Sequence, residues 1–108
     1  MSSKTETPTK GLRFDEGKNR LDLIPSEWIL GLGRVLTMGA NKYEPRNWEL
    51  GMDWSRVEGS LRRHDAAFWG GENIDPESGL PHPLHTAWNA LALYSYLERG
   101  LGDDDRPR

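Results

Sequence analysis

The chain has 108 residues, of which 35% are hydrophobic and 29% charged, with a formal net charge of −3 and no cysteine. A chain of this length builds a single domain, and the acidic excess argues against a duplex-DNA partner, which needs a basic face. The lack of cysteine excludes disulfides, thiolate catalysis and zinc fingers. Neither a membrane-spanning apolar run of about 20 residues nor a secretory signal pattern is present, so the expected location is the cytoplasm.

The two terminal segments differ in composition from the rest of the chain. Residues 1–10 and the acidic residues 102–108 carry little apolar surface, so we expect two disordered tails. Residues 11–101 then form one helical domain. Within it, a DEGK turn between extended residues 12–14 and 20–24 predicts a short N-terminal arm resembling a β-hairpin.

The first predicted helix covers residues 26–38, because apolar side chains recur there at helical spacing. Gly39 is its expected end. Gly31 and Gly33 each destabilise a helix by about 1 kcal/mol relative to Ala. We therefore expect another element to pack closely against this part of the helix.

Two further helices follow. Ser55 and Glu58 form a capping box, which predicts a helix from Ser55 to the glycines at 70–71. A third helix from Pro83 to Arg99 is apolar around most of its circumference, as in a buried helix. The predicted fold is thus mainly α, a compact bundle of about three helices. Its five tryptophans exceed what one small core absorbs, so we also predict a homo-oligomer.

Polar side chains interrupt the apolar stripes of the second and third helices. His64 lies on the only apolar stripe of the second helix. His85 and Asn89 share one stripe of the third helix, one turn after His82. Buried polar groups need partners. These side chains are therefore either hydrogen-bonded structural residues or the lining of a polar cavity.

The loop between these two helices brings three carboxylates close to the histidines. Glu72, Asp75 and Glu77 lie within six residues, and like charges repel one another unless solvent or a cation separates them. Together with His82 and His85 they form a candidate site for Mg²⁺ or Mn²⁺, and less well for Fe²⁺ or Zn²⁺. The alternative is a solvated acidic loop.

The connector between the first two helices, residues 39–54, carries groups that suit a nucleotide. Cations and an amide would bind phosphates, and flat aromatic rings would stack on a base. The alternative is a packed surface loop anchored by a tryptophan. The candidate nucleotide-binding residues, including two outside the connector, are Lys42, Tyr43, Arg46, Asn47, Trp48, Arg63 and Asn89.

Three motifs follow one another along residues 11–98: RFDEGKNRLDLIP, GANKYEPRNWELG and LRRHDAAFWGGENIDPESGLPHPLHTAWNAL. In this order they resemble the phage and bacterial family of dATP/dGTP diphosphohydrolase N-terminal domains. The resemblance implies a helical domain that binds or acts on purine deoxynucleoside triphosphates in the host cytoplasm. The matched positions are Lys42, Tyr43, Asn47, Trp48, Arg63, His64, Glu72, Asp75, Glu77, Ser78, Gly79, His82, His85 and Asn89.

These observations leave three hypotheses about function. The first is a metal-dependent pyrophosphohydrolase that converts dATP or dGTP to dNMP and pyrophosphate. Its catalytic residues would be His64, Glu72 and Asp75, with His64 or a free carboxylate as general base and Trp48 stacked on the purine. The second is a non-catalytic phage protein that sequesters a host signalling nucleotide. The third is a small helical oligomerisation domain.

Overall fold

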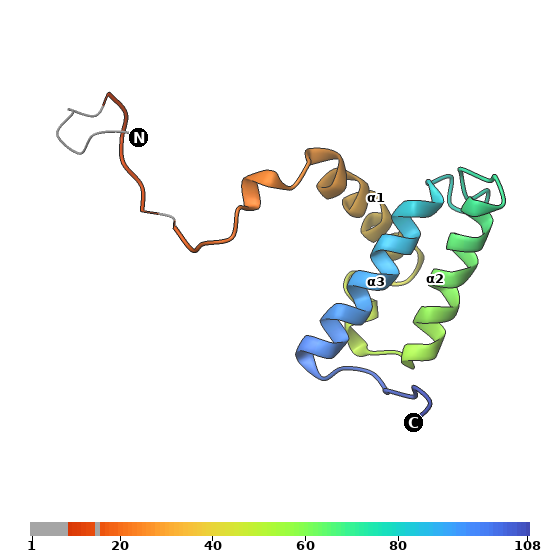
Figure 1. Cartoon of the computed structure of the whole chain (residues 1–108). Coiled ribbons are helices and arrows are strands. Elements are labelled where there is room, and N and C mark those ends of the chain that lie inside the picture. The colour runs from red at the N-terminus through yellow and green to blue at the C-terminus, as the bar shows by residue number, and fades with distance from the viewer. Residues whose placement is uncertain (1–8, 15) are drawn as a thin grey trace.

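The computed structural model describes residues 9–14 and 16–108, and its helices are α1 (Ser26–Lys42), α2 (Trp54–Trp69) and α3 (His82–Arg99). Two short 3₁₀ helices, η1 (Leu21–Leu23) and η2 (Asn47–Leu50), precede α1 and α2. α2 and α3 run antiparallel side by side, and α1 leans against the first half of α3 (Figure 1). The predicted mainly α fold of three helices is confirmed.

The predicted hairpin-like arm is wrong, because the described residues contain no strand. Residues 21–23 form η1 instead of an extended segment, and part of the predicted turn, Asp15, lies outside the described residues. The described arm runs away from the helices (Figure 1), and Leu12 and Phe14 stay exposed. A two-stranded hairpin without an apolar face to pack against is marginal in water, which explains why none forms.

α1 is longer than predicted. It continues past Gly39 to Lys42, and the Tyr43 N–H then donates to the Gly39 carbonyl oxygen at 2.9 Å. Close packing is confirmed at Gly31, where a Cβ would lie 2.5 Å from Leu84 Cδ2, but not at Gly33, where a Cβ would meet nothing within 4 Å.

The start of α2 is capped by a distant part of the chain. The predicted capping box does not form, since Ser55 donates both its backbone N–H, at 2.9 Å, and its hydroxyl to the Asp105 carboxylate. Glu58 pairs instead with Arg62 at 2.6 Å. The Trp54 N–H donates to the Asp103 carbonyl oxygen at 2.9 Å. Residues 102–108, for which the composition predicts a disordered tail, thus contact the first turn of α2.

The core surrounds Tyr96, which is fully buried with Val57 and Ala92 between α2 and α3. The Tyr96 hydroxyl donates to the Trp48 carbonyl oxygen at 2.6 Å, which ties η2 to α3. The partly buried residues packed around this core are Trp48, Trp54, Trp88, Leu93 and Leu101. Three of the five tryptophans therefore serve the core of one chain.

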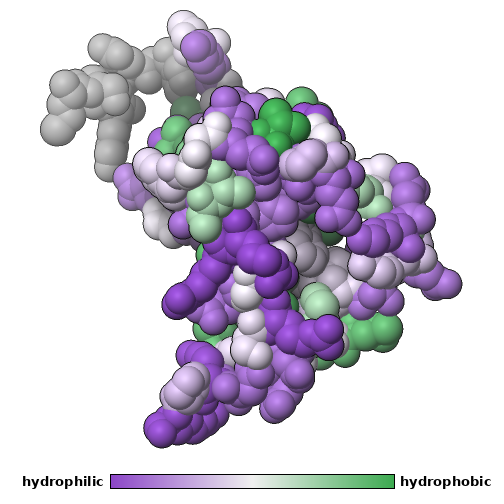
Figure 2. Space-filling view, turned by 90° about the vertical axis from the view of Figure 1, so that its right-hand side faces the viewer, coloured by the Kyte–Doolittle hydropathy of each residue, from purple (hydrophilic) through white to green (hydrophobic). Residues whose placement is uncertain are grey.

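The outer surfaces of the helices differ in character. The side of the molecule seen in Figure 2 is mostly hydrophilic. α3, however, exposes Leu91, Tyr94 and Leu97, so within one chain it is not buried all round as its sequence predicts. None of the described helices is both long and apolar enough to cross a membrane.

Candidate metal centre

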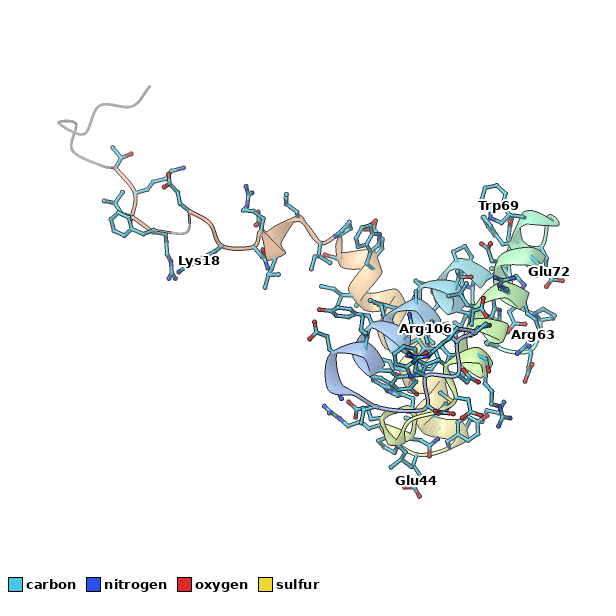
Figure 3. All side chains as sticks on the ribbon, turned by 60° about the horizontal axis from the view of Figure 1, so that its bottom comes forward. Lys18, Glu44, Arg63, Trp69, Glu72 and Arg106 are labelled. Atoms are coloured by element: carbon cyan, nitrogen blue, oxygen red, sulfur yellow. The ribbon has the colours of Figure 1, made fainter. Side chains whose placement is uncertain are left out.

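Histidines and a carboxylate converge at the end of the helix pair where α2 ends and α3 begins. His64 comes from α2, Asp75 from the connecting loop of residues 70–81, and His85 from α3. One potential ligand atom from each lies within 4.8 Å of the others. The His64 and His85 rings are stacked, with centroids 4.3 Å apart. We call these three residues the His–Asp–His cluster; nearby Arg63, Trp69 and Glu72 are labelled in Figure 3.

Backbone hydrogen bonds within the 70–81 loop position Asp75. Its N–H donates to the Leu80 carbonyl oxygen at 2.9 Å, and its carbonyl oxygen accepts from the Gly79 N–H at 2.7 Å. Gly79 has a φ of +73°, a conformation that glycine adopts without strain. The Asp75 carboxylate also accepts hydrogen bonds from the backbone N–H groups of Glu77, at 3.3 Å, and Ser78, at 3.2 Å. The loop therefore holds this carboxylate in a fixed orientation toward the histidines.

The protonation states in the cluster suit a metal ion. Burial lowers the pKa of both His64 and His85, which favours their neutral forms. Burial alone would raise the pKa of Asp75, but hydrogen bonds from Ser78 and the Glu77 N–H outweigh it and lower the pKa. Neutral imidazoles and an ionised carboxylate are the forms that bind divalent metals.

A second chain of contacts orients His64 from outside the cluster. Glu72 Oε1 lies 2.7 Å from His82 Nε2, and His82 Nδ1 lies 2.9 Å from His64 Nδ1. In the tautomer in which His82 Nε2 donates to the Glu72 carboxylate, His82 Nδ1 is the acceptor of the second contact. His64 then donates from Nδ1, which leaves the lone pair on its Nε2 free. Such outer contacts commonly set the tautomer of a metal-binding histidine.

Ser78 and Asn89 complete the surroundings of His85. The Ser78 hydroxyl lies 2.7 Å from His85 Nε2, which is itself 3.6 Å from Asp75 Oδ2. Asn89 is buried and donates to the His85 carbonyl oxygen at 2.8 Å and to Ser60 Oγ at 3.3 Å. Asn89 thus links α2 to α3 rather than facing solvent. From the sequence, Ser78 had no predicted role other than its place in the third family motif. Its position in the acidic loop between the two helices was the signal that could have indicated a role.

The predicted metal ligands are therefore only partly brought together. Asp75 and His85 lie in the cluster, while Glu72 reaches it through His82. Glu77 points elsewhere, since its side chain is 82% exposed and pairs with Lys42 at 3.5 Å. His64, expected as a base, takes a ligand position in the cluster.

Most of the predicted nucleotide-binding residues lie away from the cluster. Trp48 packs against Trp88 and Tyr96, with ring centroids 6.1 Å from each. Arg46 directly precedes η2 and Asn47 is its first residue, next to Trp48. Arg63 and Asn89 lie near the cluster, next to His64 and His85 respectively. Lys42 is connected to the 70–81 loop by its ion pair with Glu77, and Tyr43 beside it is exposed.

Comparison with known proteins agrees with the resemblance. The profile of the family described as dATP/dGTP diphosphohydrolase, N-terminal, matches residues 8–106. A protein named dATP/dGTP diphosphohydrolase from Salmonella phage PMBT28 is 32% identical over 96 residues, which cover 89% of this chain and 33% of that protein. The chain thus spans about a third of that relative's length. No solved structure matches it significantly. The chain belongs to the dATP/dGTP diphosphohydrolase N-terminal family.

Proposed function

We propose that this domain binds a divalent metal ion through His64, Asp75 and His85 and hydrolyses a purine deoxynucleoside triphosphate to dNMP and pyrophosphate. The observation that carries the proposal is the cluster itself, whose potential ligand atoms lie within 4.8 Å of one another. The name of the phage relative supports the substrate class. Two imidazoles and one carboxylate suit Mn²⁺ better than Mg²⁺, which prefers oxygen ligands.

The residues around the cluster supply the remaining chemical groups. A bound divalent ion would polarise a phosphoryl oxygen and lower the pKa of water. With His64 used as a ligand, we assign the general base to Glu72, whose half-exposed carboxylate is the solvent end of the Glu72–His82–His64 chain. Arg63 is exposed one residue before His64, where its charge can attract the phosphates.

Turnover is the direct test of this proposal. Purified protein with dGTP or dATP and Mn²⁺ is expected to release dNMP and pyrophosphate, measured by chromatography, because the cluster would hold the metal ion and Glu72 would act as the base. Asp65→Asn is the matched control, since Asp65 is an exposed carboxylate of α2 that lies outside the cluster and accepts from Trp69 Nε1 at 3.2 Å. Its turnover should equal that of the wild type. No product at enzyme concentrations near those of the substrate would contradict catalysis.

A second candidate function is nucleotide binding without turnover. The chain spans only about a third of its phage relative, so catalysis in the longer protein can depend on the part that this chain does not match. In that case the same residues would retain a nucleotide, as in a protein that sequesters a host signalling nucleotide. Recovery of intact dGTP from heat-denatured complex would support this function, whereas recovery of dGMP would contradict it.

We also propose self-association, with a second copy of the chain as the occupant of two apolar surfaces. The described part of the N-terminal arm stands away from the helices (Figure 1). Phe14 on this arm is 89% exposed. α3 separately exposes Leu91, Tyr94 and Leu97. Contiguous exposed apolar residues on small proteins commonly mark interaction sites.

Light scattering measures this self-association. The expected mass is at least twice the 12.3 kDa of the chain, and Phe14→Ser should shift it toward the monomer because the arm loses its largest apolar side chain. A wild-type mass of 12.3 kDa would contradict self-association.

A further inference from the structure

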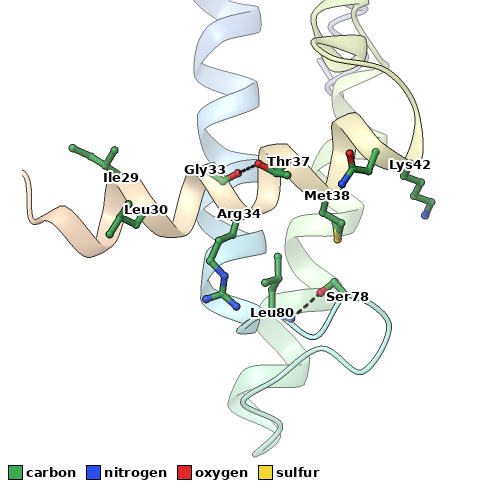
Figure 4. Close-up of a pocket in the computed structure, with 10 residues that line it drawn as sticks. Ile29, Leu30, Gly33, Arg34, Thr37, Met38, Lys42, Ser78 and Leu80 are labelled. Carbon is green, nitrogen blue, oxygen red and sulfur yellow. Dashed lines mark hydrogen bonds between the residues drawn. The ribbon is translucent and has the colours of Figure 1, made fainter.

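An open groove lies between α1 and the 70–81 loop (Figure 4). Its volume is about 840 Å³, within the usual range for small-molecule sites. Ile29, Leu30, Met38 and Leu80 give it an apolar lining. The groove is thus large enough and apolar enough to accept a flat aromatic ring.

Ser78 connects this groove to the cluster. Its side chain lines the groove, and its hydroxyl lies 2.7 Å from His85 Nε2. Its backbone N–H also donates to the Asp75 carboxylate at 3.2 Å. A ligand in the groove would therefore reach the cluster across one residue.

Gly33 keeps the groove open along α1. Glycine inside a helix is unfavourable relative to alanine, and at Gly31 close packing against Leu84 explains it. Gly33 lines the groove, and a Cβ there would meet nothing within 4 Å. Packing within the described part of the chain therefore does not require this glycine, whereas a ligand lying flat against the helix backbone would.

The polar groups of the groove suit an anion. Arg34, Asn41 and Lys42 line it, although the whole chain has a net charge of −3. In Figure 4 the Arg34 side chain projects from α1 alongside Leu80. Lys42 pairs with Glu77 at 3.5 Å, but both side chains are largely exposed, so a phosphate can compete for this ammonium group. Two cations beside an apolar lining match a nucleoside polyphosphate.

We infer that this groove binds the purine nucleotide, with the base against Gly33 and the apolar lining. The polyphosphate passes Arg34 and Lys42 toward Ser78 and the cluster. The inference rests on the proposed function and adds to it the place where the substrate is recognised. It also replaces Trp48, which packs in the core, as the surface that holds the base.

Gly33→Leu tests the inference, with Gly33→Ala as the matched control. A Cβ at position 33 meets nothing within 4 Å, so a leucine side chain is expected to occupy the groove above α1, and dGTP binding measured by calorimetry should weaken by about tenfold or more. Alanine adds only one methyl group at the same place, so it should weaken dGTP binding by less than leucine does. Neither variant should lower the melting temperature, because both residues favour a helix more than glycine does. Mn²⁺ binding should stay at the wild-type level in both.

Arg34→Gln adds a readout of ligand polarity. Loss of one charge-assisted contact to a phosphate should weaken dGTP binding by about tenfold. Deoxyguanosine, which has no phosphate, should bind the variant as tightly as it binds the wild type. Equal loss for both ligands would contradict the placement of the phosphates.

The outcomes separate this inference from the proposed function. A Gly33→Leu protein that binds dGTP as tightly as the wild type would overturn the groove and leave the metal centre intact. A wild-type protein that binds no Mn²⁺ would overturn the metal centre, and its dGTP binding would still test the groove. If Gly33→Leu lowers the mass seen by light scattering and leaves dGTP binding unchanged, the groove is a contact between copies, and the inference is wrong.

Discussion

Replacing Asp75 by asparagine is expected to weaken Mn²⁺ binding by more than about 100-fold. Loss of a residue that only hydrogen-bonds to a metal ligand lowers metal affinity by roughly 10- to 100-fold, and loss of a ligand itself should lower it further. Asp75 is the only carboxylate among the three described residues of the cluster, so the change removes its negative charge while keeping a similar shape. Calorimetric titration with Mn²⁺ measures the effect. The nucleotide product should disappear in parallel, because the proposed reaction needs the ion.

The control for this prediction is again Asp65→Asn, which removes one carboxylate from an exposed site one residue from His64. It should bind Mn²⁺ like the wild type. In Asp75→Asn the single side-chain oxygen can accept from only one of the Glu77 and Ser78 N–H groups, which bind different oxygens of the Asp75 carboxylate, so a modest fall in melting temperature is expected and Mn²⁺ binding is compared on the folded protein. Wild-type Mn²⁺ affinity in Asp75→Asn would show that the ion binds elsewhere.

The largest expected loss of stability comes from Tyr96→Ala. Tyr96 is fully buried between α2 and α3, so its truncation should lower the free energy of unfolding by about 3–5 kcal/mol. This is a large part of the roughly 5–15 kcal/mol that holds a domain together. Urea denaturation followed by tryptophan fluorescence measures it. A loss below about 1 kcal/mol would contradict the central place of this residue in the core.

Tyr96→Phe separates the hydrogen bond from the packing. It keeps the ring and removes only the donor to the Trp48 carbonyl oxygen, so we expect a loss of about 1–3 kcal/mol. Mn²⁺ binding by folded Tyr96→Phe should equal that of the wild type, because the cluster lies at the start of α3 and Tyr96 lies near its end.

Local sequence patterns predicted the three helices but not the contacts between distant segments. Helical spacing and the glycines at 70–71 and 100 placed α2 and α3 to within a residue or two. The capping box failed because Ser55 binds Asp105, 50 residues away. A short polar segment gives no local signal for such a contact, so composition alone assigned residues 102–108 to a disordered tail.

The candidate site was predictable where burial and polarity conflict on a helix. His64 and His85 stand out because each occupies an apolar stripe, and the structure brings both into one cluster. Acidity alone was a weaker guide, since Glu77 turns outward to Lys42. Trp48 was predicted to stack on a purine, but it packs against the core. Residue type alone could not separate these two roles, because an aromatic ring packs equally well in a core and against a nucleobase.

Anomalous diffraction at the manganese edge tests the metal centre most directly. Crystals of the wild-type protein grown with Mn²⁺ are expected to show one strong peak within direct bonding distance of His64, Asp75 and His85. Asp75→Asn crystals should lose that peak. A peak held by other carboxylates, such as Asp103 to Asp105, or no peak at millimolar Mn²⁺, would contradict the metal centre on which the proposed function depends.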